Sequence, residues 1–78
     1  MTDKNVVTRS IETDDGIRCV DIFRRSDGTY GFEEYRRDVE DGRGWHRIGY
    51  YAENVYETAE AALDSAIVQV SWLKSVIP

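Results

Sequence analysis

The chain has few of the residues that cross-link small proteins. Its 78 residues include one cysteine, one proline and one histidine, which excludes an internal disulfide and a zinc site built from cysteine and histidine. A chain of this length buries only about 60–65% of its unfolded surface, so its margin of stability is thin. Apolar packing must therefore hold the fold, and association with a second copy would strengthen it.

Long apolar runs are also missing. No stretch approaches the roughly 20 apolar residues of a membrane span. The opening residues, MTDKNVVTRSIETDD, lack the charged and then apolar layout of a signal peptide. We therefore expect a single domain over residues 1–78 that lies in the cytoplasm and has no membrane partner.

Groups suited to catalysis are scarce as well. His46 adjoins an expected strand, and Cys19 lies within another, so we expect a polar surface residue and a small buried thiol. Glu33 and Glu34 are adjacent in a strand and point to opposite faces, which prevents them from sharing a proton or a metal. We expect them to form solvated ion pairs with nearby arginines.

No ligand-binding motif fills this gap. The oxygen-rich segment Asp38-Val39-Glu40-Asp41-Gly42 lacks the spacing of an EF-hand calcium loop. No glycine-rich phosphate loop precedes the expected helix. The sequence therefore favours a protein that is not an enzyme and that holds neither a cofactor nor a metal.

The charge is unevenly spread along the chain. The net charge is −5, but residues 16–50 hold seven arginines and seven carboxylates, and the excess of acid lies toward the two ends. An acidic field slows approach to nucleic acids and anionic membranes. Eight arginines against two lysines is still a bias, and arginine is the better partner for aromatic rings and carboxylates.

Three turn signals divide the first two thirds of the chain: Thr13-Asp14-Asp15-Gly16, Ser26-Asp27-Gly28 and Asp41-Gly42-Arg43-Gly44. Strand-length runs lie between them at residues 17–25, 30–38 and 45–51. The run at 6–12 is weaker, and residues 1–12 form either an edge strand or a disordered tail. The pattern predicts an α+β fold with a three- or four-stranded antiparallel β-meander.

The turn at Ser26-Asp27-Gly28 predicts the register of the central hairpin. It suits a type I turn whose glycine takes the left-handed position of a bulge, and it pairs Ile22 with Phe32. One face then carries Val20, Ile22 and Phe32, and the other carries Cys19, Phe23 and Tyr35, with Asp21 opposite Glu33. Gly31 opposite Phe23 leaves a flat place for a ring or another backbone.

One C-terminal helix is expected to cover one sheet face. Thr58 is a good N-cap and Glu60 lies in the first turn, so the helix should begin near Ala59. One apolar stripe follows at helical spacing: Ala59, Ala62, Leu63, Ala66, Ile67, Val70 and Leu73. Because a single helix covers one face only, apolar residues on the other face remain for something else.

A second apolar line, at spacing of four, flanks this stripe. Trp72 in that line either wraps around the sheet edge or joins rings of the uncovered face in a contact between two copies. The candidate interaction residues are Phe23, Tyr35, Tyr50, Tyr51, Val68, Trp72 and Val76. They predict a homodimer or a contact with another protein.

Nucleic-acid binding is the alternative. Its candidate residues alternate with rings along the expected sheet: Arg18, Arg24, Arg36, Arg37 and Arg47. Residues 28–66 resemble plant ethylene-response-factor DNA-binding domains in the order Trp45, Gly49-Tyr50 and a helix start at residues 58–62. That resemblance implies three strands followed by a helix. The carboxylates among these strands depart from it and would repel phosphates.

Residues 16–73 also resemble a group of short bacterial proteins, chiefly from alphaproteobacteria, to which no activity is assigned. The shared features are DGTYGFEEYRRD at residues 27–38, then GW, GYY, an alanine-rich helix led by Thr58, and Trp72-Leu73. This resemblance implies a sheet with one helix and transfers no site residues. Together with the open sheet face, it favours a small protein-interaction module that forms a homodimer.

Overall fold

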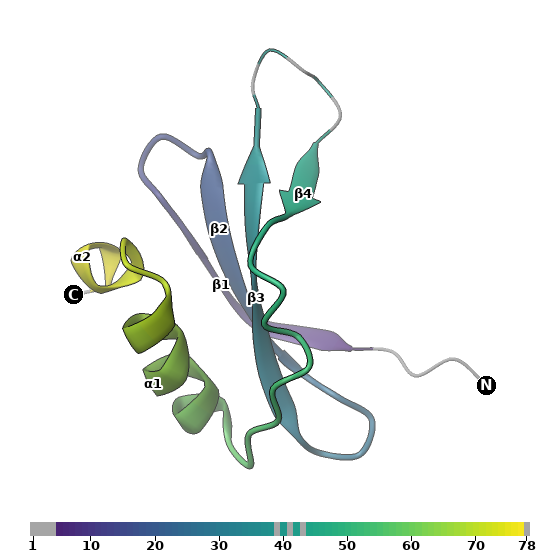
Figure 1. Ribbon diagram of the computed structural model, residues 1–78. Helices are drawn as coiled ribbons and strands as arrows, with labels where there is room; N and C mark the ends of the chain where they lie inside the picture. Colours follow the sequence, from purple (N-terminus) through teal and green to yellow (C-terminus); the bar gives the residue numbers. More distant parts are fainter. Residues whose placement is uncertain (1–4, 39, 41, 43, 78) are drawn as a thin grey trace.

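The computed structural model describes residues 5–38, 40, 42 and 44–77. One antiparallel sheet and two helices follow in chain order: β1 (Val6–Glu12), β2 (Arg18–Arg24), β3 (Tyr30–Arg37), β4 (Trp45–Arg47), α1 (Ala59–Gln69) and α2 (Leu73–Val76). Figure 1 shows both helices on one side of the sheet. The predicted α+β meander with a C-terminal helix is confirmed, and its first run is an edge strand.

The β2–β3 hairpin has the register that its turn predicts. Gly28 has a φ of 87°, in the left-handed region that glycine adopts without strain. The N–H of Gly28 donates to the carbonyl of Arg25 over 3.0 Å, and the N–H of Arg25 donates to the carbonyl of Thr29 over 2.7 Å. Ile22 therefore lies opposite Phe32. All strand faces follow from this pairing, because side chains alternate along a strand.

The core lies between α1, α2 and one face of the sheet. Fully buried residues from both layers form it: Val20, Ile22, Phe32, Ala62, Ala66, Val70 and Leu73, with Ile11 of β1 nearly so. Small alanines in α1 let the helix approach the twisted sheet closely. Leu63 and Ile67, at the margin of the same stripe, are half-buried and pack against the core.

The helical segment begins as expected but does not continue as one helix. The Thr58 hydroxyl caps α1 by accepting the N–H of Ala61 over 3.0 Å. α1 ends at Gln69, and a turn leads into the short helix α2. The predicted single helix is therefore wrong at its end, because this turn directs Leu73 into the core beside β1. Among the described residues, no helix is long and apolar enough to cross a bilayer.

The fourth strand is shorter than predicted. β4 ends at Arg47, and Tyr50 has a φ of 56°, which turns the chain out of the extended conformation. Residues 48–58 then run beside β3, as Figure 1 shows in green. The segment rejoins β3 where Tyr30 and Tyr56 exchange backbone hydrogen bonds of 2.8 and 2.9 Å. The expected strand at 45–51 therefore becomes a short strand and a linker.

Candidate functional site

The sheet face opposite α1, termed the open face, is formed by alternate residues of the strands, except where a register shift in β1 places Val7 and Ser10 on the same face. The registers assign to it Val7, Ser10, Glu12, Cys19, Asp21, Phe23, Gly31, Glu33, Tyr35, Arg37, Trp45 and Arg47. Neither helix packs on this face. Because it contains rings and charges of both signs, the open face is the candidate binding surface.

Charge divides the open face into two halves. Its carboxylates on the first two strands are Glu12 and Asp21, while its guanidinium groups on the last two strands are Arg37 and Arg47. Glu33, the remaining charged residue of these strand positions, is only 1% exposed. At the strand positions, one half therefore presents negative charge and the other half positive charge, and the linker places Glu53 beside Arg47 and Tyr50 on the basic half.

Arginines of the basic half stack on its rings. The guanidinium carbon of Arg37 lies 4.8 Å from the ring centroid of Trp45, and that of Arg47 lies 5.2 Å from the ring centroid of Tyr50. Such pairs stabilise by about 0.5–1 kcal/mol at exposed sites. Tyr50 is 71% exposed. The basic half thus offers rings and charges in a fixed arrangement.

Phe23, predicted as an interaction residue, is covered by its own chain and is 5% exposed. Its ring fills the space over Gly31, where an added Cβ would lie 2.8 Å from the ring. The guanidinium carbon of Arg25 lies 5.0 Å from the ring centroid, and one of its nitrogens lies over the same place at Gly31. The flat place expected at Gly31 is therefore occupied, and Phe23 is not available to a partner.

Arg25 also holds the linker that precedes α1. Its guanidinium donates to the carbonyls of Tyr30 over 2.8 Å, of Asn54 over 3.0 Å, and of Ala52. A residue just beyond a strand end carries no sequence signal for this role. Sequence reasoning therefore missed the residue that covers Phe23.

A small hollow of about 140 Å³ lies where the two halves meet, and it is lined by Ser10, Glu12, Cys19 and Asp21 of the acidic half and by Tyr35 and Trp45 of the basic half. Asp21 accepts hydrogen bonds from the Ser10 hydroxyl over 2.7 Å and from the Cys19 thiol over 3.2 Å. Burial raises the pKa of the Cys19 thiol to about 11. The thiol is therefore protonated at neutral pH, which suits a hydrogen-bond donor and not a nucleophile.

Other titratable groups of this region do not form a catalytic set. Burial raises the pKa of the Tyr35 phenol, and the nearby carboxylates of Asp21 and Glu33 act in the same direction. His46 pairs with Arg36 across the strands and so belongs to the opposite face from Cys19. The structure does not bring the only cysteine and the only histidine together.

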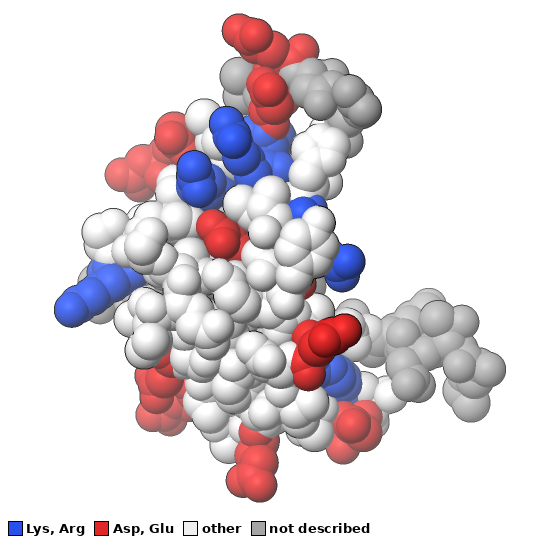
Figure 2. All heavy atoms as spheres, viewed as in Figure 1, with Lys and Arg blue, Asp and Glu red and all other residues white. Residues whose placement is uncertain are grey.

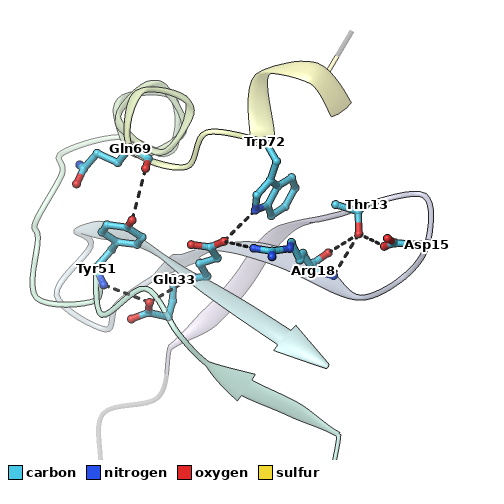
Figure 3. Close-up of polar contacts among 8 residues, drawn as sticks. Thr13, Asp15, Arg18, Glu33, Tyr51, Gln69 and Trp72 are labelled. Atoms are coloured by element: carbon cyan, nitrogen blue, oxygen red, sulfur yellow. Dashed lines mark hydrogen bonds and ion pairs between the residues drawn. The ribbon is translucent and has the colours of Figure 1, made fainter. Parts of the chain in front are cut away.

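The two adjacent glutamates are buried, which corrects the expectation of solvated ion pairs. Glu33 accepts three backbone N–H groups: its own neighbour Glu34 at 3.0 Å, and Tyr51 and Ala52 at 3.1 Å each. Figure 3 shows this carboxylate under Tyr51. Glu33 thus anchors the linker to β3, a role that its position in an alternating strand did not indicate.

Trp72 lies against the helix side of the sheet. Its indole N–H donates to Glu34 over 2.8 Å, and Arg18 approaches the same carboxylate at 3.9 Å. Figure 3 shows Trp72 and Arg18 pointing toward one carboxylate. Val76 is half-buried against the core, while Val68 on α1 is 84% exposed. The expected flank of three residues is therefore broken by the turn after α1.

The two adjacent tyrosines separate. The Tyr51 ring lies 4.9 Å from the Phe32 ring centroid, and its hydroxyl lies 3.5 Å from the carbonyl of Gln69. Tyr51 therefore packs against the core. Tyr50 points out beside Arg47, so it is the tyrosine of this pair that a partner can reach.

The five arginines proposed for nucleic-acid binding do not share a face. The registers place Arg18, Arg24 and Arg36 on the helix side, and Arg37 and Arg47 on the open face. Figure 2 shows basic side chains over one end of the sheet with acidic side chains beside them. A single arginine surface does not form.

Comparisons of the chain with protein-family models, curated proteins and solved structures found no match. The resemblance to the short bacterial proteins stays a prediction.

Proposed function

We propose that this chain is a small, non-enzymatic interaction module that forms a homodimer through its open face. The division of charge on that face carries the proposal. Glu12 and Asp21 lie on one half and Arg37 and Arg47 on the other, so the face is complementary to a second copy of itself.

Consider two copies whose open faces pack on each other. A two-fold axis between the two faces, parallel to the strands and level with the gap between β2 and β3, would bring opposite charges together. It lays β1 of one copy over β4 of the other and repeats each contact twice. The acidic half of each copy then faces the basic half of its partner. The hollow beside Asp21 offers two carboxylates and two rings to a guanidinium of the second copy.

The rings of the face support the same arrangement. Trp45 and Tyr50 are exposed on the basic half, and Val7 is exposed on β1. Aromatic rings and arginine are enriched in the buried part of protein interfaces, because they bury much area at small entropic cost. Packing of two open faces would cover these residues in both copies.

A charge exchange tests this proposal by light scattering on a size-exclusion column. The wild-type chain should elute as a dimer. Glu12 and Arg47 lie in one row of the sheet, so the two-fold axis places them against each other. Glu12→Arg brings two arginines together at this contact and Arg47→Glu brings two glutamates together, so each variant alone should be monomeric. Their equimolar mixture should recover a dimer, because the two altered faces complement each other.

The control is Arg24→Glu, which reverses an exposed charge on the helix side of the sheet. This variant should remain a dimer. A monomeric wild-type chain would overturn the homodimer. Dimers of both charge variants, alone, would overturn the choice of the open face.

Nucleic-acid binding has weaker support. The division of its five arginines between two faces leaves two guanidinium groups on the open face and three on the helix side. Glu34 and Asp21 lie among them and repel phosphates. The interaction of two protein copies accounts for more of the surface.

A further inference from the structure

The outer edge of β1 is a second, separate surface. β1 is one of the two edge strands of the sheet, and six of its seven residues are exposed. An edge strand presents unpaired backbone N–H and C=O groups along its outer side. Among the described residues, no strand lies beside this edge.

A groove runs between β1 and the first turns of α1. α1 packs over β2 and β3, and β1 lies on the far side of β2, as Figure 1 shows. The groove has a volume of about 400 Å³ and is lined by Thr8, Arg9, Ile22, Ala59, Glu60 and Leu63. Its apolar part comes from Ile22, Ala59 and Leu63.

We propose that an extended segment of another protein adds to β1 as a fifth strand and places an apolar side chain in this groove. Strand addition derives affinity from backbone hydrogen bonds, and specificity from pockets that receive alternate side chains. The exposed edge supplies the first requirement. The groove, on the helix side of the same strand, supplies the second.

The charges at the groove define the segment further. Arg9 of β1 lies on one wall of the groove, and Glu60 of α1 lies on the other wall. A complementary segment therefore carries an apolar residue with an acidic residue directed toward Arg9 and a basic residue directed toward Glu60. Segments with like charges at these positions would be rejected.

A second copy of this chain fits the groove poorly. In a continuous sheet formed by two β1 strands, the side chains that reach the groove come from the helix side of β1. Those residues are Val6, which is 61% exposed, Arg9, which is charged, and Ile11, which is 8% exposed within its own core. Val6 is apolar, but the residues two positions away from it are Lys4 and Thr8, so the copy has no carboxylate beside Val6 to face Arg9, and the observations favour a different protein.

The first test is selection from a random peptide library displayed on phage. The wild-type chain should enrich peptides with apolar residues at alternate positions and charges of both signs. Ala59→Glu places a carboxylate in the groove, at a helix start where negative charge is tolerated. It should weaken the selected peptides at least about tenfold. Ala61→Glu, at an exposed position of the same turn, should bind them like the wild type.

Hydrogen exchange gives the second readout. A selected peptide should slow exchange of β1 backbone amides, and the same peptide with a central proline should not. The monomeric variant Arg47→Glu should bind equally, because β1 is separate from the charge pairs of the dimer. Absence of enrichment, or equal binding by Ala59→Glu, would overturn strand addition and leave the open-face dimer untouched. Concentration-dependent protection of β1 without peptide would instead identify a second copy as the occupant.

Discussion

The indole N–H of Trp72 donates to a carboxylate oxygen of Glu34 over 2.8 Å. This contact joins the turn between the helices to the third strand. The carboxylate is mostly buried, and Arg18 lies 3.9 Å from the same oxygen. A residue that the sequence offers as an interface tryptophan thus has a structural partner inside its own chain.

Trp72→Phe should lower the free energy of unfolding by about 1–3 kcal/mol, because it leaves a buried carboxylate without its donor. Urea denaturation followed by circular dichroism measures this loss. Glu34→Gln should lower the free energy of unfolding less when it is added to Trp72→Phe than when it is made in the wild-type chain. Strict additivity of the two losses would show that the contact contributes nothing.

Gly49→Ala should destabilise the chain by about 1–3 kcal/mol through crowding. An added Cβ would lie 2.6 Å or less from two atoms of the Tyr51 ring and 2.9 Å from Glu34. Thermal unfolding should show a lower midpoint. Tyr51→Leu should recover part of the loss when it is introduced into the Gly49→Ala chain, since it removes the nearest atoms. A glycine variant as stable as the wild type would contradict the close packing of this turn.

Arg25→Lys should release the linker although the charge is kept. Lysine cannot span three carbonyl groups with a planar fork, and the guanidinium of Arg25 reaches the carbonyls of Tyr30, Ala52 and Asn54. Exchange of linker amides at residues 52–56 should accelerate in Arg25→Lys and in Arg25→Met alike. Arg24→Lys, at the adjacent exposed position, is the matched control. Unchanged exchange in Arg25→Met would remove this role.

The Cys19 thiol should react slowly with iodoacetamide until the pH is high. An ordinary thiol has a pKa of about 8.5, whereas burial raises the pKa of Cys19 to about 11. Because the folded chain keeps this proton after the unfolded chain has lost it, the thiol contributes a stability that falls as pH rises across that interval. The difference in unfolding free energy between wild type and Cys19→Ser should show this slope. An alkylation midpoint near the ordinary value would contradict the buried donor.

A gel-shift titration separates the nucleic-acid alternative from the dimer. With a random DNA duplex at low salt, we expect no shifted band at micromolar protein. Binding through arginines would appear at low salt and weaken steeply as salt rises. If it appears, Arg18→Ala with Arg36→Ala, compared with Arg37→Ala with Arg47→Ala, identifies the face that contacts DNA.

The sequence predicted those parts of the fold that local chemistry determines. Gly28 in its turn fixes which strand residues pair, so the opposition of Ile22 and Phe32 follows from a few residues. Thr58 and the alanines after it place the start of α1 for a similar reason. In both cases, neighbours in the chain supply the interaction.

The missed features depend on contacts between distant segments. The course of the linker after β4 depends on Glu33 of β3, which accepts the N–H groups of Tyr51 and Ala52. The turn after Gln69 forms because it allows Leu73 to be buried beside β1. Phe23 is predictable as a ring on the open face, but its cover by Arg25 becomes visible only once the linker is in place.

The linker between β4 and α1 owes its course to side chains of the sheet. Glu33 takes the N–H of Ala52 and Arg25 takes the carbonyl of the same residue. A carboxylate and a guanidinium therefore bind the two backbone polar groups of one residue, and both hydrogen bonds are independent of the alanine side chain. Different side chains at residues 52–54 should leave the position of α1 unchanged. A single substitution at Glu33 or Arg25 should instead make the position of the whole linker variable. That makes Asn54, which is exposed, a permissive place to introduce a label or a reporter group, whereas Ala52 and Glu53 line a hollow with Arg47 and Tyr50 of the open face.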